Sequence, residues 1–162
     1  METLWAPWRI QYIEQPKPQG CIFCDKPSEN LDKENFILYR GDFCFVIMNF
    51  YPYNNGHLMV VPFRHTSDIS DLTSEERLEM MELLSLCKEA LIQTISPHAF
   101  NIGMNLGEIA GAGVKDHLHF HIVPRWSGDT NFMPILGHTK VVSEGLTQTW
   151  EKLKKHFENF NN

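Results

Sequence analysis

Residues 117–123 have the sequence His-Leu-His-Phe-His-Ile-Val, in which three histidines alternate with apolar residues. Strict alternation over a short run is typical of a β-strand with one buried face. We therefore expect Leu118, Phe120 and Ile122 to point into a core and the three imidazoles to project from the opposite face. Such a row suits nucleophilic catalysis, proton transfer or metal binding. The alternative is a solvated polar face, although such faces more often use Thr, Lys or Glu.

The length and charge of the chain exclude several classes of protein. A chain of 162 residues fits a single domain, residues 1–162, with a sizeable core. A net charge of −6 argues against non-specific binding to nucleic acid. No apolar run approaches the roughly 20 residues of a membrane span, and the first five residues lack the features of a signal peptide. We expect a cytoplasmic protein that binds neither nucleic acid nor a membrane.

Short apolar runs separated by turn residues predict further strands. They lie at residues 36–39, 43–48, 57–62 and 100–106. A capping box at residues 73–76 (Thr-Ser-Glu-Glu) opens a helix that runs to about Ile95, and a C-terminal helix is predicted at residues 143–158. Because the strands do not alternate regularly with helices, we expect an α+β fold with a mostly antiparallel sheet.

Three smaller expectations concern packing. The apolar stripe of the long helix is expected to bury Leu78 and Met81. Residues 25–35 are polar and predict a loop. Residues 1–20 contain Trp5 and Trp8, and we expect this aromatic arm to pack on the domain or on a partner subunit. Two of the four cysteines, at positions 44 and 87, lie in apolar patterns and are expected in the core.

The other two cysteines, Cys21 and Cys24, form a C-x-x-C pair, which suits half of a zinc site or a redox pair. Structural zinc takes four ligands. His65, which follows a predicted strand, and His117, which ends the histidine row, are candidates for the other two. A redox pair and two unligated thiols are the alternatives, but no βαβ pattern surrounds the pair.

The middle histidine, His119, has a histidine on each side that can orient it, and His57 opens a separate strand from which its ring could reach the row. An imidazole nucleophile suits phosphorus, because a phosphoimidazole forms and breaks readily. The segment 105–113 precedes the row, and its glycines can bring backbone N–H groups close to phosphate oxygens. A flexible connector is the alternative for this segment, but beside the row the phosphate interpretation is the better one.

With these residues the chain resembles the histidine triad (HIT) superfamily of nucleotide hydrolases and transferases. The resemblance rests on residues 117–123 and on an upstream half that includes Asn49, residues 56–62 (Gly-His-Leu-Met-Val-Val-Pro) and His65. Residues 5–9 (Trp-Ala-Pro-Trp-Arg), the C-x-x-C pair and residues 124–132 (Pro-Arg-Trp-Ser-Gly-Asp-Thr-Asn-Phe) are similar to the branch that contains diadenosine-tetraphosphate phosphorylases and hydrolases. The resemblance covers about residues 4–155.

The resemblance implies a five-stranded antiparallel sheet with a long helix and a C-terminal helix, usually in a homodimer whose sheets join. It implies that His119 attacks the α-phosphorus and forms a nucleotidyl-histidine, that His121 hydrogen-bonds the α-phosphate, and that His57 supports the row. The implied nucleotide- and phosphate-binding residues are Asn49, Asn105, Gly113, His121 and Trp126. Cys21, Cys24, His65 and His117 match the zinc ligands of zinc-bearing members, and no organic cofactor is implied.

One stretch departs from the family pattern. Many relatives carry Ser or Thr shortly before the row, where the hydroxyl donates to the leaving group, whereas this chain has Ala112-Gly113-Val114. Backbone N–H groups or Lys115 are the candidate replacements. We expect cleavage of a purine dinucleoside polyphosphate, such as diadenosine tetraphosphate, with phosphate or water as acceptor. The alternatives are a phosphoramidate or adenylate hydrolase, a nucleotide-binding module with little turnover, and a metallohydrolase that uses the row as ligands.

Overall fold

The protein, described here from a computed structural model over residues 20–129 and 144–160, is built around a five-stranded sheet. The strands are β1 (Ile37–Arg40), β2 (Cys44–Met48), β3 (Leu58–Pro62), β4 (Ala99–Met104) and β5 (Phe120–Arg125). The helices are α2 (Ile22–Ser28), α3 (Ser74–Ile95) and α5 (Leu146–Phe160), with 3₁₀ turns η1 (Ile69–Asp71) and η2 (Glu108–Ala110). The strand order is β1-β2-β3-β5-β4 and every neighbouring pair is antiparallel, which confirms the predicted α+β class.

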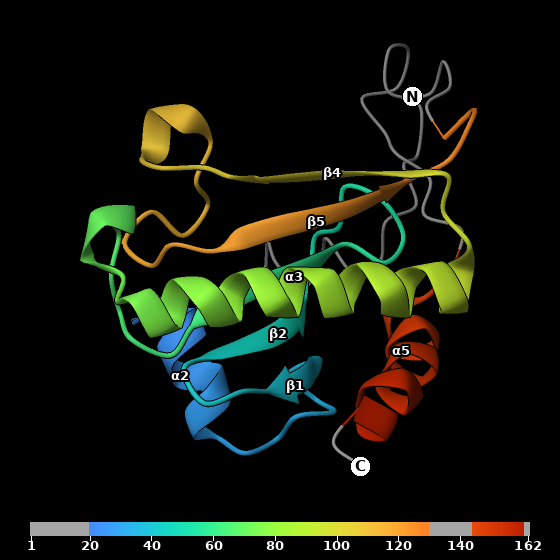
Figure 1. The fold of residues 1–162 in the computed structure, drawn as a ribbon, viewed down its shortest axis with the longest axis horizontal. Coiled ribbons are helices and arrows are strands. Elements are labelled where there is room, and N and C mark those ends of the chain that lie inside the picture. Colours follow the sequence, from blue (N-terminus) through green and yellow to red (C-terminus); the bar gives the residue numbers. More distant parts are fainter. Residues whose placement is uncertain (1–19, 130–143, 161–162) are drawn as a thin grey trace, which may run out of the picture.

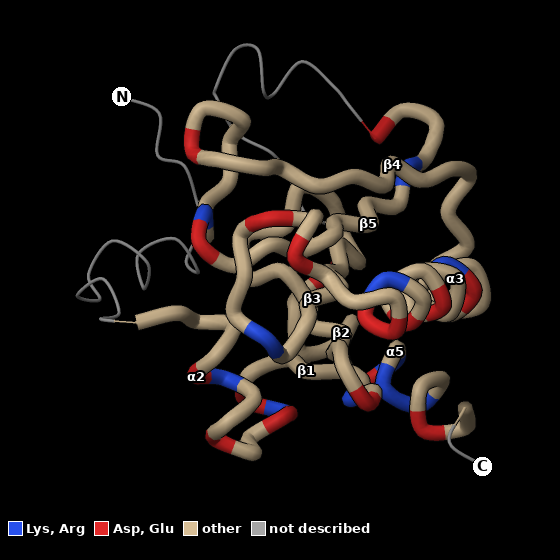
Figure 2. The backbone as a smooth tube through the Cα atoms, turned by 60° about the vertical axis from the view of Figure 1, so that its left-hand side comes forward, with Lys and Arg blue, Asp and Glu red and all other residues tan. Residues whose placement is uncertain are grey.

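Different helices pack on the two faces of the sheet. Helix α3 runs across one face (Figure 1), and a view from the side places α3 and α5 on one side of the sheet and α2 on the other (Figure 2). Alternate residues of β2 show the two faces. Val46 packs with α3 and α5 in the larger core, whereas Phe45 and Ile47 pack with Phe23 of α2 in a smaller one. Both central strands, β2 and β3, are buried along their whole length.

The same alternation places the histidine row. Leu118 and Ile122 are buried in the core under α3, and Phe120 packs against it, as predicted. His121 pairs in register with Met59 of β3, whose side chain belongs to the smaller core, so the histidines lie on the α2 face of the sheet. Strand β5 begins only at Phe120, three residues later than predicted, so the first two histidines precede the strand.

The predicted elements are present, with ends that differ by at most three residues. The capping box of α3 is confirmed, because the Thr73 hydroxyl accepts from the Glu76 N–H at 3.1 Å and the Glu76 carboxylate accepts from the Thr73 N–H at 2.8 Å. Cys44 and Cys87 are fully buried, as expected. None of the helices in the described residues is long and apolar enough to cross a membrane.

The predicted stripe of α3 was wrong at its start. Leu78 and Met81 are 61% and 60% exposed, and the buried stripe begins instead at Met80. It continues through Leu83, Leu84, Leu86, Cys87, Ala90 and Leu91. Because α3 carries apolar residues around much of its circumference, the sequence offers two overlapping stripes, and only contact with the sheet selects one.

The loop predicted at residues 25–35 was also partly wrong, because α2 occupies Ile22–Ser28. A seven-residue helix with Pro27 in its last turn has little intrinsic stability. Its first turn is the C-x-x-C segment, in which the Cys24 and Asp25 N–H groups donate to the Cys21 carbonyl at 2.9 Å. The aromatic arm and residues 130–132 lie outside the described residues, and the assignment of residues 1–162 to one domain stays a prediction.

Candidate active site

A pocket of about 1050 Å³ opens on the α2 face of the sheet. His119 and His121 line it together with Phe23 of α2 and Met59 of β3. Residues 111–116, which lead from η2 towards β5, form another wall. The rings of His119 and His121 are 4.7 Å apart between centroids and nearly perpendicular. The fold therefore brings two of the predicted catalytic histidines to the same cavity, between the sheet and a loop rich in glycine.

A chain of hydrogen bonds sets the protonation pattern of His57 and His121. The backbone N–H of Tyr53 donates to Nδ1 of His57 at 3.1 Å, so in a neutral ring the proton of His57 is on Nε2. That Nε2–H donates to Nδ1 of His121 at 2.9 Å. The proton of His121 is consequently on its own Nε2, where it can be donated to an oxygen in the pocket.

In His119 the proton is on the other ring nitrogen. Its Nδ1 lies 3.0 Å from the backbone carbonyl oxygen of His117, which can only accept, so Nδ1 carries the proton. The Nε2 atom is left with a free lone pair. Phe23 packs against this ring at 4.8 Å between centroids and limits its rotation. One histidine of the pocket is therefore arranged as a nucleophile and its neighbour as a hydrogen-bond donor.

Burial keeps these rings neutral. Burial lowers the pKa of His119, and the hydrogen bond to the His117 carbonyl opposes that shift. Burial, followed by the nearby charge of His119, lowers the pKa of His121 to about 4. A neutral His119 has the lone pair that a nucleophile needs at neutral pH.

Cys21, Cys24, His65 and His117 are brought together beside the pocket, with all four ligand atoms within 4.8 Å of one another. Nδ1 of His117 lies 3.2 Å from Sγ of Cys21 and 3.5 Å from Sγ of Cys24. Nδ1 of His65 lies 3.4 Å from Sγ of Cys24 and 3.3 Å from Nδ1 of His117. Four donor atoms at these separations surround one point, so the group could hold a metal ion.

The surroundings of this group favour a cation. The Nε2–H of His117 donates to the Pro62 carbonyl at 2.8 Å, which turns the lone pair of Nδ1 towards the cysteines. Burial, followed by the hydrogen bond and the charge of Cys21, raises the pKa of the Cys24 thiol to about 11. Without a cation the Cys24 thiol therefore stays protonated, whereas a bound metal ion would replace its proton.

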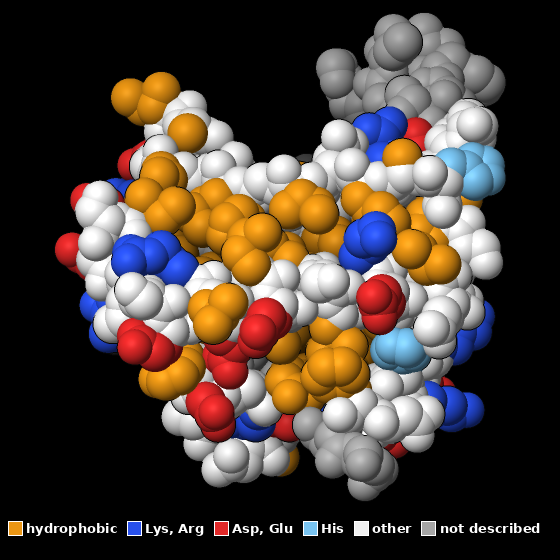
Figure 3. All heavy atoms as spheres, viewed as in Figure 1, with side chains coloured by type: hydrophobic (Ala, Val, Ile, Leu, Met, Phe, Trp, Pro, Cys, Tyr) orange, Lys and Arg blue, Asp and Glu red, His pale blue; other side chains and the backbone are white. Residues whose placement is uncertain are grey.

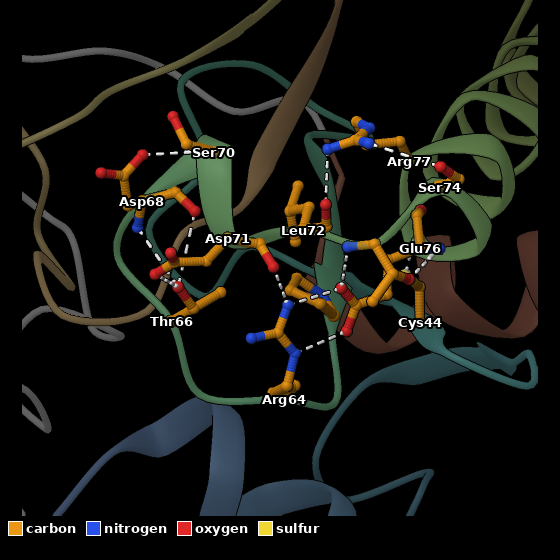
Figure 4. Close-up of polar contacts among 12 residues, drawn as sticks. Cys44, Arg64, Thr66, Asp68, Ser70, Asp71, Leu72, Ser74, Glu76 and Arg77 are labelled. Carbon is orange, nitrogen blue, oxygen red and sulfur yellow. Dashed lines mark hydrogen bonds and ion pairs between the residues drawn. The ribbon is translucent and has the colours of Figure 1, made fainter.

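A polar network involves Arg64 and Thr66, the residues before and after His65 in the chain (Figure 4). The preceding residue, Arg64, donates two hydrogen bonds at 2.9 and 2.7 Å to Glu76, which is 5% exposed at the start of α3. The Arg64 hydrogen bond holds the pKa of Glu76 below its usual range. The following residue, Thr66, accepts the Leu118 N–H at 2.7 Å through its carbonyl, which ties the segment after β3 to the histidine row.

The structure separates the predicted nucleotide-binding residues into two groups. Asn49 and Gly113 line the pocket with His121. Asn105 and Trp126 are not among the described residues that line it. The Asn105 amide donates to the Gly111 carbonyl at 3.5 Å, and the Trp126 indole N–H donates to the Ser96 carbonyl at 3.2 Å. The binding roles of all four residues stay predictions.

Several lining residues were not nominated individually from the sequence. The pocket lining includes Tyr51 and Tyr53 as well as Asn49, and Glu108 contributes a carboxylate from η2. The tyrosines follow Asn49 by two and four residues in a turn-rich segment, so their position near a predicted nucleotide-binding residue could have indicated them. No local signal indicates Glu108, because its place depends on how the loop folds back over the sheet.

Comparison with known proteins agrees with this geometry. Residues 30–128 match the HIT domain family. An AP-4-A phosphorylase of Mycobacterium tuberculosis is 38% identical over 157 residues, which cover 92% of this chain and 80% of that protein. A bis(5'-adenosyl)-triphosphatase of Saccharomyces cerevisiae is 31% identical over 91 residues, 56% of this chain and 44% of that protein.

A solved structure gives the same result for the fold. A zinc-bound histidine triad family protein from Mycobacterium smegmatis superposes with a TM-score of 0.70 at 24% identity, over 88% of this chain and 96% of that one. This likeness agrees with the five-stranded fold that the family resemblance implies. Family match, relatives and structure agree, and this chain belongs to the HIT domain family.

Proposed function

We propose that this HIT-type enzyme cleaves a dinucleoside polyphosphate of the diadenosine tetraphosphate kind at its α-phosphorus. The nucleotidyl group passes through His119 to phosphate or water. The observation that carries the proposal is the pattern of hydrogen bonds, which leaves a lone pair on Nε2 of His119 beside an N–H of His121. The relatives named as an AP-4-A phosphorylase and a bis(5'-adenosyl)-triphosphatase support the class of substrate.

The reaction consists of two displacements. In the first, the lone pair of His119 Nε2 forms a bond to the α-phosphorus while the bond from phosphorus to the bridging oxygen breaks, and the remaining nucleoside polyphosphate leaves. In the second, an oxygen of phosphate or water attacks the same phosphorus and the bond to nitrogen breaks. His121 donates its Nε2–H to a non-bridging oxygen throughout, which stabilises charge that grows in the transition state. Its orientation comes from His57 and the Tyr53 backbone.

We also propose zinc as the ion held by Cys21, Cys24, His65 and His117. Zinc–sulfur bonds of about 2.3 Å and zinc–nitrogen bonds of about 2.0–2.1 Å give ligand separations of roughly 3.3–3.8 Å in a tetrahedron. The four sulfur–nitrogen and nitrogen–nitrogen distances of 3.2–3.5 Å fit that shape. A zinc ion with four protein ligands leaves no open position for substrate, so its role is structural. It would hold α2, and with it Phe23, against His119.

The product assay tests the proposed reaction. Incubating the protein with diadenosine tetraphosphate should give ATP and ADP when inorganic phosphate is present, or ATP and AMP when water is the acceptor. Separation of the nucleotides by ion-exchange chromatography, with and without phosphate, identifies the acceptor. If neither this dinucleotide nor diadenosine triphosphate is turned over, while an adenosine phosphoramidate or an acyl-adenylate is, the substrate class is wrong.

We further propose that two copies pair through β4. The family resemblance implies a homodimer whose sheets join, and the choice of β4 comes from the exposed side chains of this strand. Strand β4 is an edge of the sheet. Hydrophobic side chains gather along β4 and between it and α3 (Figure 3), and Ile102 is 48% exposed there. An edge strand with an apolar face is suited to pairing with another strand.

Light scattering on a size-exclusion column should show a dimer for the unmodified protein. The Ile102→Asp variant should shift it towards a monomer, because it places a charge in the interface. Leu31→Asp, a change at an exposed leucine that lies far from β4 in sequence, serves as control and should leave the dimer intact. A monomeric unmodified protein at micromolar concentration would contradict the proposal.

A further inference from the structure

We propose that Lys115 is the cation that binds the leaving phosphate chain in the first displacement and the acceptor phosphate in the second. This inference rests on the proposed function and assigns its phosphate subsite. It would also favour phosphate over water as the acceptor.

The charges around the pocket single out Lys115. Among the described residues that line the cavity, Lys115 is the only lysine or arginine, and the acidic residues are Glu108 and Asp116. A dinucleoside polyphosphate brings several negative charges into this cavity. Hydrogen bonds between a cation and phosphate oxygens are among the strong ones in proteins. Lys115 is therefore the described side chain of the pocket that can offer the polyphosphate a full positive charge.

Lys115 forms an ion pair that is weak enough for a phosphate group to replace it. Its ammonium lies 3.4 Å from the Glu108 carboxylate of η2, and the two side chains are 55% and 78% exposed. An ion pair with this much exposure contributes little stability. Glu108 is thus a weak counter-ion that keeps the lysine over the pocket, and a phosphate group with more charge can displace it.

The residues that precede Lys115 offer the substrate no side-chain hydrogen-bond donor. They are Ala112, Gly113 and Val114, and all three line the pocket. A Cβ atom added at Gly113 would meet nothing within 4 Å, so this wall has open space beside the lysine. Lys115, two residues further on, brings a full positive charge to the same wall.

The geometry of two successive displacements connects the leaving group with the acceptor. The leaving oxygen departs on the side of phosphorus opposite to His119, and the acceptor oxygen must attack the nucleotidyl-histidine from that same side. A cation that binds the departing phosphate is therefore already in place for an incoming phosphate. Water offers no negative charge to that cation, so Lys115 lowers the barrier for phosphate selectively.

The test is the partition of the nucleotidyl group between phosphate and water. With diadenosine tetraphosphate and inorganic phosphate, the ratio of ADP to AMP measures phosphorolysis against hydrolysis. Lys115→Ala should lower this ratio and raise the KM for phosphate, each by roughly 10- to 100-fold. Lys115→Arg should restore most of both. Lys33→Ala is the matched control, because Lys33 also forms an exposed pair, with Glu151 at 3.3 Å, but does not line the pocket.

A second test changes the counter-ion instead of the lysine and is expected to shift the KM for phosphate in the opposite direction. Glu108→Gln removes the counter-ion and should lower the KM for phosphate several-fold with the same ADP to AMP ratio or a higher one. An unchanged ratio and KM in Lys115→Ala, with thermal unfolding like that of the unmodified protein, would overturn the assignment. An unmodified protein that forms only AMP in excess phosphate would overturn it as well. A protein without nucleotidyl transfer to either acceptor would reject the proposed function itself.

Discussion

His119→Ala is expected to lower the cleavage of diadenosine tetraphosphate by at least about 10⁴-fold, the scale seen when an enzyme loses its nucleophile. The physical reason is that Nε2 of His119 is the free lone pair of the pocket, whereas the hydrogen bonds of His121 and His57 leave their nitrogens protonated or occupied. Steady-state rates and nucleotide affinity should be measured on the same preparations. The affinity should change by less than about tenfold, because the pocket keeps its other contacts.

Trapping the intermediate tests whether His119 is a nucleophile or only contacts the bound nucleotide. Denaturing the unmodified protein during turnover, without acid, should leave a nucleotidyl mass on the chain that maps to the peptide containing His119, and His119→Ala should lack it. His156→Ala is the control, because His156 lies on α5 and does not line the pocket. If His119→Ala keeps more than about a tenth of the activity, His119 is not the nucleophile.

Loss of the metal group is expected to have the largest effect on stability. Cys24→Ser should release the ion and lower the free energy of unfolding by about 3 kcal/mol or more, or roughly 6–12 °C in Tm. The reason is that α2 is a short helix whose first turn contains the two cysteines. Its Phe23 is buried in the smaller core and contacts the ring of His119. Metal content by mass spectrometry and thermal unfolding by circular dichroism are the measurements.

A second cysteine distinguishes loss of metal from loss of a thiol. Cys87 is fully buried in α3 and far from the metal group in sequence, so Cys87→Ala should keep one metal ion per chain. Activity should fall together with metal content in Cys24→Ser, because the carbonyl of His117 holds His119. A purified protein with no bound metal, and a Cys24→Ser variant as stable as the parent, would contradict the structural role.

Much of the fold could be predicted because its signals are local. The alternation at residues 117–123 and the apolar runs around it indicate strands, and the Thr73–Glu76 capping box marks where α3 begins. The errors occur where local signals are ambiguous. The stripe of α3 was wrong at Met81, since two apolar faces compete. Helix α2 was missed because its stability depends on contacts that Phe23 and Cys24 make with distant parts of the chain, and not on local helix propensity.

In the candidate site, too, the features with a local sequence signal could be predicted and those that depend on distant contacts could not. Residue types and their spacing were enough to nominate the histidine row and the C-x-x-C pair. Sequence could not show that Lys115 and Glu108 form a pair in the pocket wall, because η2 and the segment before β5 meet only after the loop folds back. Asn105 and Trp126 were nominated by resemblance, and the structure places their side chains against the Gly111 and Ser96 carbonyls.

By itself the sequence determined which face of β5 carries the histidines and which cysteines can share an ion, because strand periodicity and chelate spacing act over a few neighbouring residues. Only the tertiary structure decided which ring nitrogen keeps a lone pair and which carries a proton. A neutral imidazole takes its tautomer from its hydrogen-bond partners, and here these come from the Tyr53 backbone, His57 and the His117 carbonyl. His57 and the Tyr53 backbone lie more than 60 residues from His121 along the chain and become its neighbours only when β3 and β5 pair.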